Sequence, residues 1–242
     1  MIDQKELQES GVLLVDKPTE WTSHDVVNFV RRRFGISKVG HCGTLDPAAT
    51  GLLILVIERA TKLQDRLMSD DKMYEGTMLL GVSTDSQDAD GAVIAEKPVP
   101  PLTEEDIDQV FAKFRGDLQQ VPPMVSAVKH QGTPLYKLAR KGKTVEREPR
   151  LVHIYDFRVL GLELPRVRLR VACTKGTYVR TLCSDVGDLL GCGAHLYELR
   201  RMRSGNFDVK DAHSLETILQ QTREQLKAFI IPILKFIGPS AT

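Results

Sequence analysis

Apolar positions along the chain follow two spacings, which together predict most of its secondary structure. Continuous apolar runs at residues 11–15 and 51–57 are typical of buried strands. Between Ser23 and Gly35 the apolar residues recur at every third or fourth position. This spacing predicts a helix that has Ser23 as its N-cap and Gly35 as its stop.

Residues 167–173 show another kind of strand, in which apolar and basic residues alternate. Val167, Leu169 and Val171 are separated by arginines, so we expect one buried face and one cationic face. Strands and helices do not alternate strictly along the chain, which favours an α+β fold with a mixed sheet over a doubly wound fold. The other predicted strands cover residues 73–82, 151–164 and 195–203, and the other predicted helices cover residues 59–68, 103–114, 134–140, 178–190 and 214–220.

Length and charge then change the picture. A chain of 242 residues with 42% hydrophobic and 27% charged residues is globular, which excludes wholesale disorder and coiled coil. The net charge of only +1 hides an uneven distribution, because residues 122–150 carry seven basic against two acidic residues and residues 161–205 carry eight against four. Such segments either form a basic surface that binds a polyanion or are simply the solvated faces of helices and strands. We expect one domain over residues 1–242, with residues 122–150 as an insertion and proline-rich residues 96–103 as the best linker candidate.

Several classes of protein are excluded by missing motifs. The sequence contains no GxxxxGK[ST], GxGxxG, HEXXH or GxSxG pattern, so we expect chemistry that needs neither a metal nor a nucleotide cofactor. Its four cysteines form no CxxC pair, which favours a reduced setting. No secretory signal and no apolar run of about 18–20 residues is present, so we expect a cytoplasmic protein that does not enter membranes.

One segment, residues 41–51, is dense in glycine and other small residues and contains a single acid, Asp46. Asp46 followed by Pro47 is what a helix N-terminus prefers, with the aspartate as cap and the proline at the first helical position. The alternative is that Asp46 carries chemistry. The rest of the chain decides between the two interpretations.

Motifs in order along nearly the whole chain carry a family resemblance. They are DKP at residues 16–18, GxLDPxATGxL around Asp46, KMY at 72–74, an SDADG-like loop at 86–91, PPMxSAxKxxGxxLYxxAR at 122–140, KGTYxRTL at 175–182 and GCGAHLxxLRR at 191–201. In these segments the chain resembles the TruB family of tRNA pseudouridine synthases. The resemblance implies the pseudouridine synthase fold, a mixed, mainly antiparallel sheet flanked by helices. It also implies isomerisation of uridine-55 in the T loop of tRNA to pseudouridine, without a cofactor.

The same resemblance assigns roles to individual residues. Asp46 matches the catalytic aspartate, Arg180 an arginine that forms an ion pair with it, and Tyr74 a tyrosine that stacks on the target uracil and is a candidate for proton transfer. Whether the aspartate attacks C1′, attacks C6 or acts as a base is left open. Substrate-binding positions are implied for His41, Tyr74, Tyr178, Leu199 and Lys17, the last within the DKP element that braces the site.

Each of these residues also has a structural interpretation. His41 would then bond only to the backbone of its loop, and the two tyrosines would be half-buried strand residues. Arg180 would pair with Asp185 one helical turn away, and Leu199 would belong to the core. The combination of motifs, not any single residue, favours the functional interpretation.

The resemblance further implies that residues 122–150 clamp the RNA and that the T-arm stem-loop of tRNA is the partner. We expect a monomer that needs no protein partner. Typical bacterial members continue into a small PUA domain, and we expect none in this sequence, which is then either a short member of the family or a trimmed piece of a longer one. Cys42 stands where threonine is common. Two alternatives stay open: an RNA-binding tRNA folding factor that does not depend on catalysis, and a guide-dependent synthase.

Overall fold

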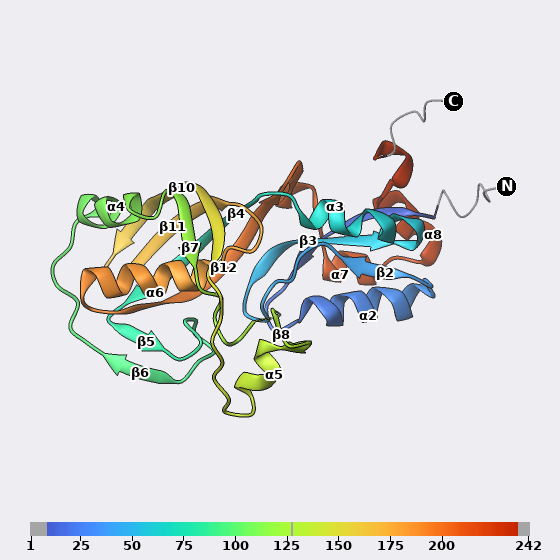
Figure 1. The fold of residues 1–242 in the computed structure, drawn as a ribbon. Helices are drawn as coiled ribbons and strands as arrows, with labels where there is room; N and C mark the ends of the chain where they lie inside the picture. The colour runs from blue at the N-terminus through green and yellow to red at the C-terminus, as the bar shows by residue number, and fades with distance from the viewer. Residues whose placement is uncertain (1–8, 127, 237–242) are drawn as a thin grey trace. The chain divides into compact units, whose positions relative to one another are not determined.

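The computed structural model describes residues 9–126 and 128–236, and it divides the chain into two compact units (Figure 1). The first unit comprises the chain up to Lys72 together with the chain from Arg200 onward. The second unit is the intervening segment Met73–Leu199. Proline-rich residues 97–103 connect a strand to a helix inside the second unit, so this predicted linker does not separate the units.

The first unit is built around two buried antiparallel strands. β1 (Gly11–Lys17) pairs along its whole length with β3 (Thr50–Ile57), and both strands are apolar and buried, as their apolar runs predict. On the other edge of β3, β2 (Val39–His41) is antiparallel, and the end of β12 (Ala194–Ser204) is parallel. Three short strands complete the sheet: β13 (Phe207–Asp208) beside β12, and β14 (His213–Ser214) and β15 (Ile230–Pro232) beside β1.

Helix α2 (Ser23–Phe34) confirms the helical spacing after the first strand, with one correction at its start. Its N-cap is Thr22, whose hydroxyl accepts a hydrogen bond from the backbone N–H of Asp25, while the Asp25 carboxylate accepts one from the N–H of Thr22. Ser23 is not the cap, because its hydroxyl bonds to a distant loop. Gly35 ends the helix in the left-handed conformation, as predicted.

The remaining helices of the first unit are short. The helix predicted over residues 59–68 is divided into a 3₁₀ segment, η1 (Glu58–Leu63), and α3 (Gln64–Met68). After β12, short helices alternate with the edge strands: η2 (Val209–Asp211), α7 (Leu215–Leu219), α8 (Arg223–Leu226), η3 (Lys227–Phe229) and η4 (Ile233–Lys235). Ser214 caps α7, where the sequence predicts a helix from this residue.

The second unit contains the sheet order β12-β4-β11-β10-β7. Its strands are β4 (Lys72–Leu80), β7 (Gly116–Gln120), β10 (Arg150–Glu163) and β11 (Arg166–Cys173). β10 is antiparallel to both β11 and β7, so the predicted pairing of residues 151–164 with residues 167–173 is confirmed. The alternation in β11 is confirmed too, because Val167, Leu169 and Val171 are fully buried while Arg166 and Arg168 are exposed.

Two helices cover the buried face of this sheet. α4 (Glu104–Ala112), capped by Thr103, and α6 (Val179–Leu190) contribute apolar residues to the core that β10 and β11 form, and Figure 1 shows both helices beside these strands. At its centre the rings of Phe111 and Phe157 are stacked with centroids 3.8 Å apart. The predicted strand over residues 73–82 ends at Leu80, and the chain continues into a separate hairpin, β5 (Val82–Thr84) with β6 (Val93–Glu96).

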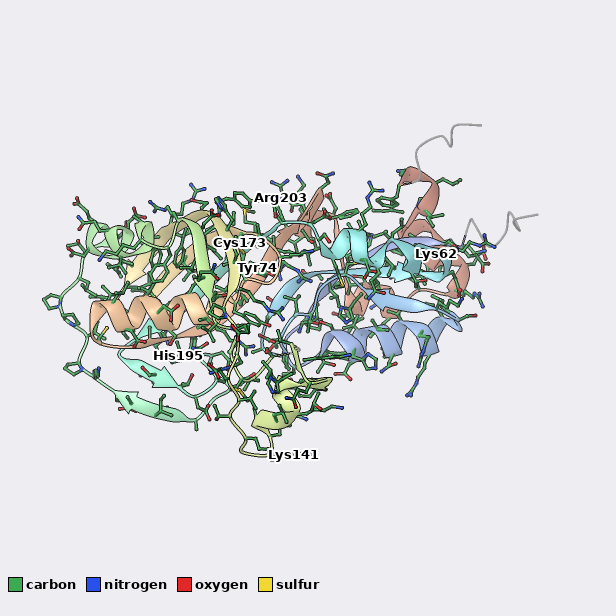
Figure 2. The ribbon with its side chains drawn as sticks, in the orientation of Figure 1. Lys62, Tyr74, Lys141, Cys173, His195 and Arg203 are labelled. Atoms are coloured by element: carbon green, nitrogen blue, oxygen red, sulfur yellow. The ribbon has the colours of Figure 1, made fainter. Side chains whose placement is uncertain are left out.

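Residues 122–150 leave and re-enter the sheet between the adjacent strands β7 and β10, as an insertion does. They contain a small hairpin, β8 (Lys129–His130) with β9 (Thr133–Pro134), and the predicted short helix α5 (Leu135–Ala139). Figure 2 shows Lys141 at the tip of the segment that follows α5.

All four cysteines are free thiols in buried positions. Cys42 belongs to the first unit, whereas Cys173, Cys183 and Cys192 belong to the core of the second.

Candidate active site

Asp46 lies in the segment between β2 and β3, residues 42–49, which we call the Asp46 loop. The interpretation of Asp46 as a helix cap is wrong, because residues 47–48 form a turn in which the N–H of Ala49 donates to the Asp46 carbonyl at 3.1 Å. Asp46 itself is half-buried. The loop therefore owes its shape to contacts from other elements, and three side chains provide them.

Lys17, the last residue of β1, supports the loop on the C-terminal side of Asp46. It is fully buried, and its ammonium group donates to the carbonyls of Pro18 (2.8 Å), Trp21 (2.7 Å) and Pro47 (3.1 Å). Burial lowers the pKa of Lys17 to about 8, although the negative charge of Asp46 opposes this shift. Its geometry is that of a residue that braces the loop, because all three hydrogens of the ammonium group point at backbone oxygens.

Ser23 supports the residue directly before Asp46. Its hydroxyl accepts a hydrogen bond from the N–H of Leu45 at 2.8 Å and donates to the carbonyl of the same residue at 3.2 Å. Ser23 is only 1% exposed. The contact of Ser23 with the loop was not predicted, because it joins residues that are distant in sequence.

Arg201 of β12 supports the beginning of the loop. Its guanidinium is 1% exposed and donates to the carbonyls of Leu52 (2.7 Å), Gly43 (3.2 Å) and Thr44 (3.5 Å). Gly51 permits this arrangement, because a Cβ atom there would lie 2.4 Å from the backbone oxygen of Arg201. Arg201 has no predicted role, because β12 carries three arginines and its sequence does not show which of them is buried.

His41 and Cys42 lie at the other entrance to the Asp46 loop. His41 is half-buried at the end of β2, and burial, with a smaller contribution from Arg201, lowers its pKa, so that the imidazole is neutral at pH 7. Burial raises the pKa of the Cys42 thiol to about 12, which keeps it unreactive.

In the second unit, Arg180 occupies the first turn of α6 and is only 4% exposed. It forms an ion pair with Asp88 at 2.9 Å, donates a hydrogen bond to the Val125 carbonyl, and lies 5.7 Å from the centre of the Tyr178 ring. The alternative pairing with Asp185 is wrong. Burial and the nearby Asp188 raise the pKa of Asp185 to about 6, whereas an ion pair with arginine would lower it.

Asp88 belongs to the loop between β5 and β6, whose sequence forms one of the motifs but received no role in the sequence analysis. Its carboxylate also accepts hydrogen bonds from the Ser86 hydroxyl and, at 3.2 Å, from the N–H of Asp90. Thr84 holds the same loop by donating to the Asp88 carbonyl at 2.7 Å. The acid that orients Arg180 is therefore fixed by its own loop.

Tyr74 and Leu199 lie on strands at the edge of the second unit's core. Tyr74 of β4 is half-buried and labelled in Figure 2, and both residues pack partly buried against the same apolar cluster. Gly76 lets the neighbouring strand approach, because a Cβ atom there would lie 2.5 Å from the Glu198 oxygen and 3.4 Å from the Leu199 side chain.

The structure therefore divides the predicted site residues between the two units. Lys17, His41 and Asp46 belong to the first unit, and Tyr74, Tyr178, Arg180 and Leu199 to the second. In the first unit, Lys17 and His41 lie next to the Asp46 loop. In the second unit, Tyr74 and Leu199 pack against one apolar cluster, and Arg180 lies beside Tyr178. The predicted ion pair between Asp46 and Arg180 joins the two units and stays a prediction.

The described residues offer neither a metal site nor a membrane-spanning helix. Among residues 9–126 and 128–236, no group of three or more histidine, cysteine, aspartate or glutamate side chains could hold a metal ion. Within the same described ranges, every helix is too short or too polar to cross a membrane.

Comparison with known proteins identifies the family. The model for the N-terminal domain of TruB family pseudouridylate synthases matches residues 31–179, and the model for the C-terminal domain of tRNA pseudouridylate synthase B matches residues 180–236. The chain therefore belongs to the TruB family of pseudouridylate synthases. It is an enzyme, an isomerase, as the motifs predict.

Individual relatives and a solved structure agree with this assignment. The tRNA pseudouridine synthase B of Opitutus terrae is 52% identical over 230 residues, which cover 95% of each chain. The tRNA pseudouridine synthase B of Stutzerimonas stutzeri is 51% identical over 209 residues, covering 86% of this chain and 68% of the relative. A chain in the crystal structure of a Cbf5-Nop10-Gar1 complex matches with a TM-score of 0.75 and 30% identity, covering 97% of this chain and 63% of that chain. The predicted pseudouridine synthase fold is thereby confirmed.

Proposed function

We propose that this enzyme isomerises uridine-55 in the T loop of tRNA to pseudouridine, with Asp46 as its catalytic residue. The observation that carries the proposal is the support of the Asp46 loop by three buried side chains. Lys17, Ser23 and Arg201 bond to backbone groups at Pro47, Leu45 and Gly43, on both sides of Asp46. Relatives that cover most of this chain are named for tRNA pseudouridine synthesis, which supports tRNA as the substrate.

The chemistry requires a carboxylate in a fixed position. Pseudouridine formation breaks the N1–C1′ bond, turns the uracil and joins C5 to C1′, with no net oxidation or reduction. A carboxylate close to the sugar and the base stabilises the positive charge that develops at C1′, or bonds covalently to one of the reacting carbons. A loop held rigidly around Asp46 keeps the carboxylate where the reacting atoms arrive.

The second unit contributes the contacts to the base in this proposal. The target uridine is stacked inside a folded loop, and turning it out costs a few kcal/mol. Stacking of the uracil on Tyr74 offsets about 1–3 kcal/mol of this cost. Arg180 provides a permanent positive charge beside the carboxylate. The other substrate contacts in the proposal are His41, Tyr178 and Leu199.

The insertion, residues 122–150, supplies the grip on the RNA backbone in this proposal. Its lysines at positions 129, 137, 141 and 143 are exposed, as cations that bind phosphates must be. Phosphate contacts position the T arm, and the pocket residues then select the base.

The test is release of tritium from a T-arm stem-loop that carries 5-tritiated uridine. We expect release by the wild type and by the control Asp211→Asn, which changes an exposed aspartate of η2, and none by Asp46→Asn. The affinity of Asp46→Asn for the stem-loop should stay within about 3-fold of the wild type, because the substitution removes no contact with a phosphate. Equal loss of turnover and affinity would contradict a catalytic role for Asp46.

A refolding assay tests the alternative of a tRNA folding factor. That alternative predicts that Asp46→Asn accelerates tRNA refolding as much as the wild type does, and it does not exclude catalysis by the wild type. Release from the isolated stem-loop, without partners, also removes the need for a guide RNA.

A further inference from the structure

Gln120, the last residue of β7, makes an unusual pair of hydrogen bonds with the backbone of Tyr178. Its side-chain carbonyl accepts from the N–H of Tyr178 at 2.8 Å, and its side-chain NH₂ donates to the carbonyl of Tyr178 at 3.1 Å. Gln120 is only 3% exposed. The amide thus holds both backbone groups of one residue, as a neighbouring strand would.

Tyr178 is the residue from which α6 begins. It has extended backbone angles, and its side chain caps nothing, while its carbonyl also accepts the helical hydrogen bond from the N–H of Leu182 at 3.2 Å. Arg180 follows two residues later, in the first turn. The direction in which Arg180 leaves the helix therefore depends on how Tyr178 is held.

Gln120 also occupies the base of the insertion. It is the cross-strand partner of Arg150, so residues 121–149 leave and return at this pair. A second connection lies a few residues further on, where the Val125 carbonyl accepts a hydrogen bond from Arg180. Pro122 and Pro123 between these two points are buried, and Arg147 on the returning side donates to the Pro122 carbonyl at 3.3 Å. The base of the insertion is thus bonded to both Tyr178 and Arg180.

We propose that Gln120 is a positioning residue that couples the RNA-binding insertion to the catalytic machinery through Tyr178. When the insertion holds the RNA, its base is fixed, and Gln120 transmits this restraint to the start of α6 and to Arg180. Gln120 contacts no reacting atom. The inference rests on the proposed function, in which Arg180 acts on the same nucleotide as Asp46.

The test compares Gln120→Leu with Gln119→Leu. Gln119 is the exposed neighbour in the same strand and provides a matched control. We expect Gln120→Leu to lower kcat for the tritiated T-arm stem-loop about 10–100-fold, since displacements near 1 Å cost this much. KM and the Kd for the stem-loop should stay within about 3-fold of the wild type, because the phosphate-binding lysines are unchanged. Gln119→Leu should match the wild type in all three values.

Amide hydrogen exchange of residues 176–182 provides a readout that does not depend on turnover. In the wild type, the stem-loop should slow this exchange, and Gln120→Leu should abolish that slowing while Gln119→Leu retains it. Gln120→Glu keeps an acceptor for the N–H of Tyr178 and loses the donor to its carbonyl, so its kcat should lie between those of the wild type and Gln120→Leu.

The outcomes distinguish the two proposals. If the wild type releases no tritium, the proposed function fails, and the exchange measurement still tests the coupling. If the wild type is active and Gln120→Leu retains its kcat and its RNA-dependent protection, the positioning role of Gln120 is wrong. If Gln120→Leu does not fold, Gln120→Glu decides, and wild-type values of kcat and protection in that variant overturn the proposal.

Discussion

Removal of a single hydroxyl group tests whether the Asp46 loop must be held for the reaction to proceed. In Ser23→Ala, the N–H of Leu45 loses its partner in a buried position, and the Leu45 carbonyl loses one donor. A buried N–H without a partner costs about 1–3 kcal/mol. In a chain of this size each kcal/mol lowers Tm by about 2–4 °C, so we expect a decrease of about 2–12 °C.

Turnover should fall together with stability. Leu45 directly precedes Asp46, so release of its backbone displaces the carboxylate itself. We expect kcat to fall about 10-fold or more, since a displacement of 1 Å costs up to about 100-fold. Tritium release measures kcat, and thermal and urea unfolding measure stability.

Ser214→Ala is the matched control. Ser214 belongs to the same unit as Ser23 and has no role in the proposed site. It caps α7, because its hydroxyl accepts a hydrogen bond from the N–H of Thr217 at 3.0 Å. Loss of such a cap costs about 0.5–2 kcal/mol, similar to the cost at Ser23. The reasoning is refuted if Ser23→Ala loses stability as Ser214→Ala does and yet retains wild-type kcat.

Further predictions concern pH, salt and the core. As pH rises through about 8, Lys17 is deprotonated and keeps only two hydrogens for the three carbonyls that it binds. Turnover should therefore fall in the wild type but not in Lys17→Arg, whose side chain stays charged. An alkaline decline of turnover in Lys17→Arg would contradict this role of Lys17. Between about pH 8 and the ordinary Lys pKa of 10.5, Lys17 binds more protons in the unfolded chain than in the folded one. Its contribution to the free energy of unfolding therefore rises with pH. Unfolding of the wild type and of Lys17→Met, compared across this range, should show this rise. Joint replacement of Lys141 and Lys143 by glutamine should reduce the slope of log Kd against log salt by about 1.4–1.8, and an unchanged slope would place the RNA elsewhere. Phe157→Ala removes a fully buried ring stacked on Phe111 and should lower the free energy of unfolding by about 3–5 kcal/mol; a loss below about 1 kcal/mol contradicts this view of the core.

The spacing of apolar residues predicted the strands whose buried face it determines. The apolar run of β3 and the alternation in β11 each specify which face is buried, so both strands lie where the sequence places them. The start of α2 shows the limit of such reasoning. Thr22 and Ser23 are both good caps, and the choice of Thr22 depends on the tertiary contact that occupies the Ser23 hydroxyl.

The supporting residues of the site were harder to predict. Arg201, Gln120 and Asp88 act through backbone groups or through another side chain, and no spacing rule shows which carbonyl a buried guanidinium meets. The helix predicted at 59–68 divides between Leu63 and Gln64, where η1 passes into α3, and no apolar spacing marks that point. Motif resemblance supplied the proposed site residues, whereas the contacts that hold them required the structure.

The placement of the cysteines makes thiol labelling a probe of local opening in each of the two units. Cys42 is the single thiol of the first unit, and the other three belong to the second, all of them shielded from solvent. A thiol reagent can modify such a residue only when the surrounding core transiently opens. Mass spectrometry of the labelled sites therefore resolves, without any engineered probe, which unit opens first and whether bound RNA protects one unit or both.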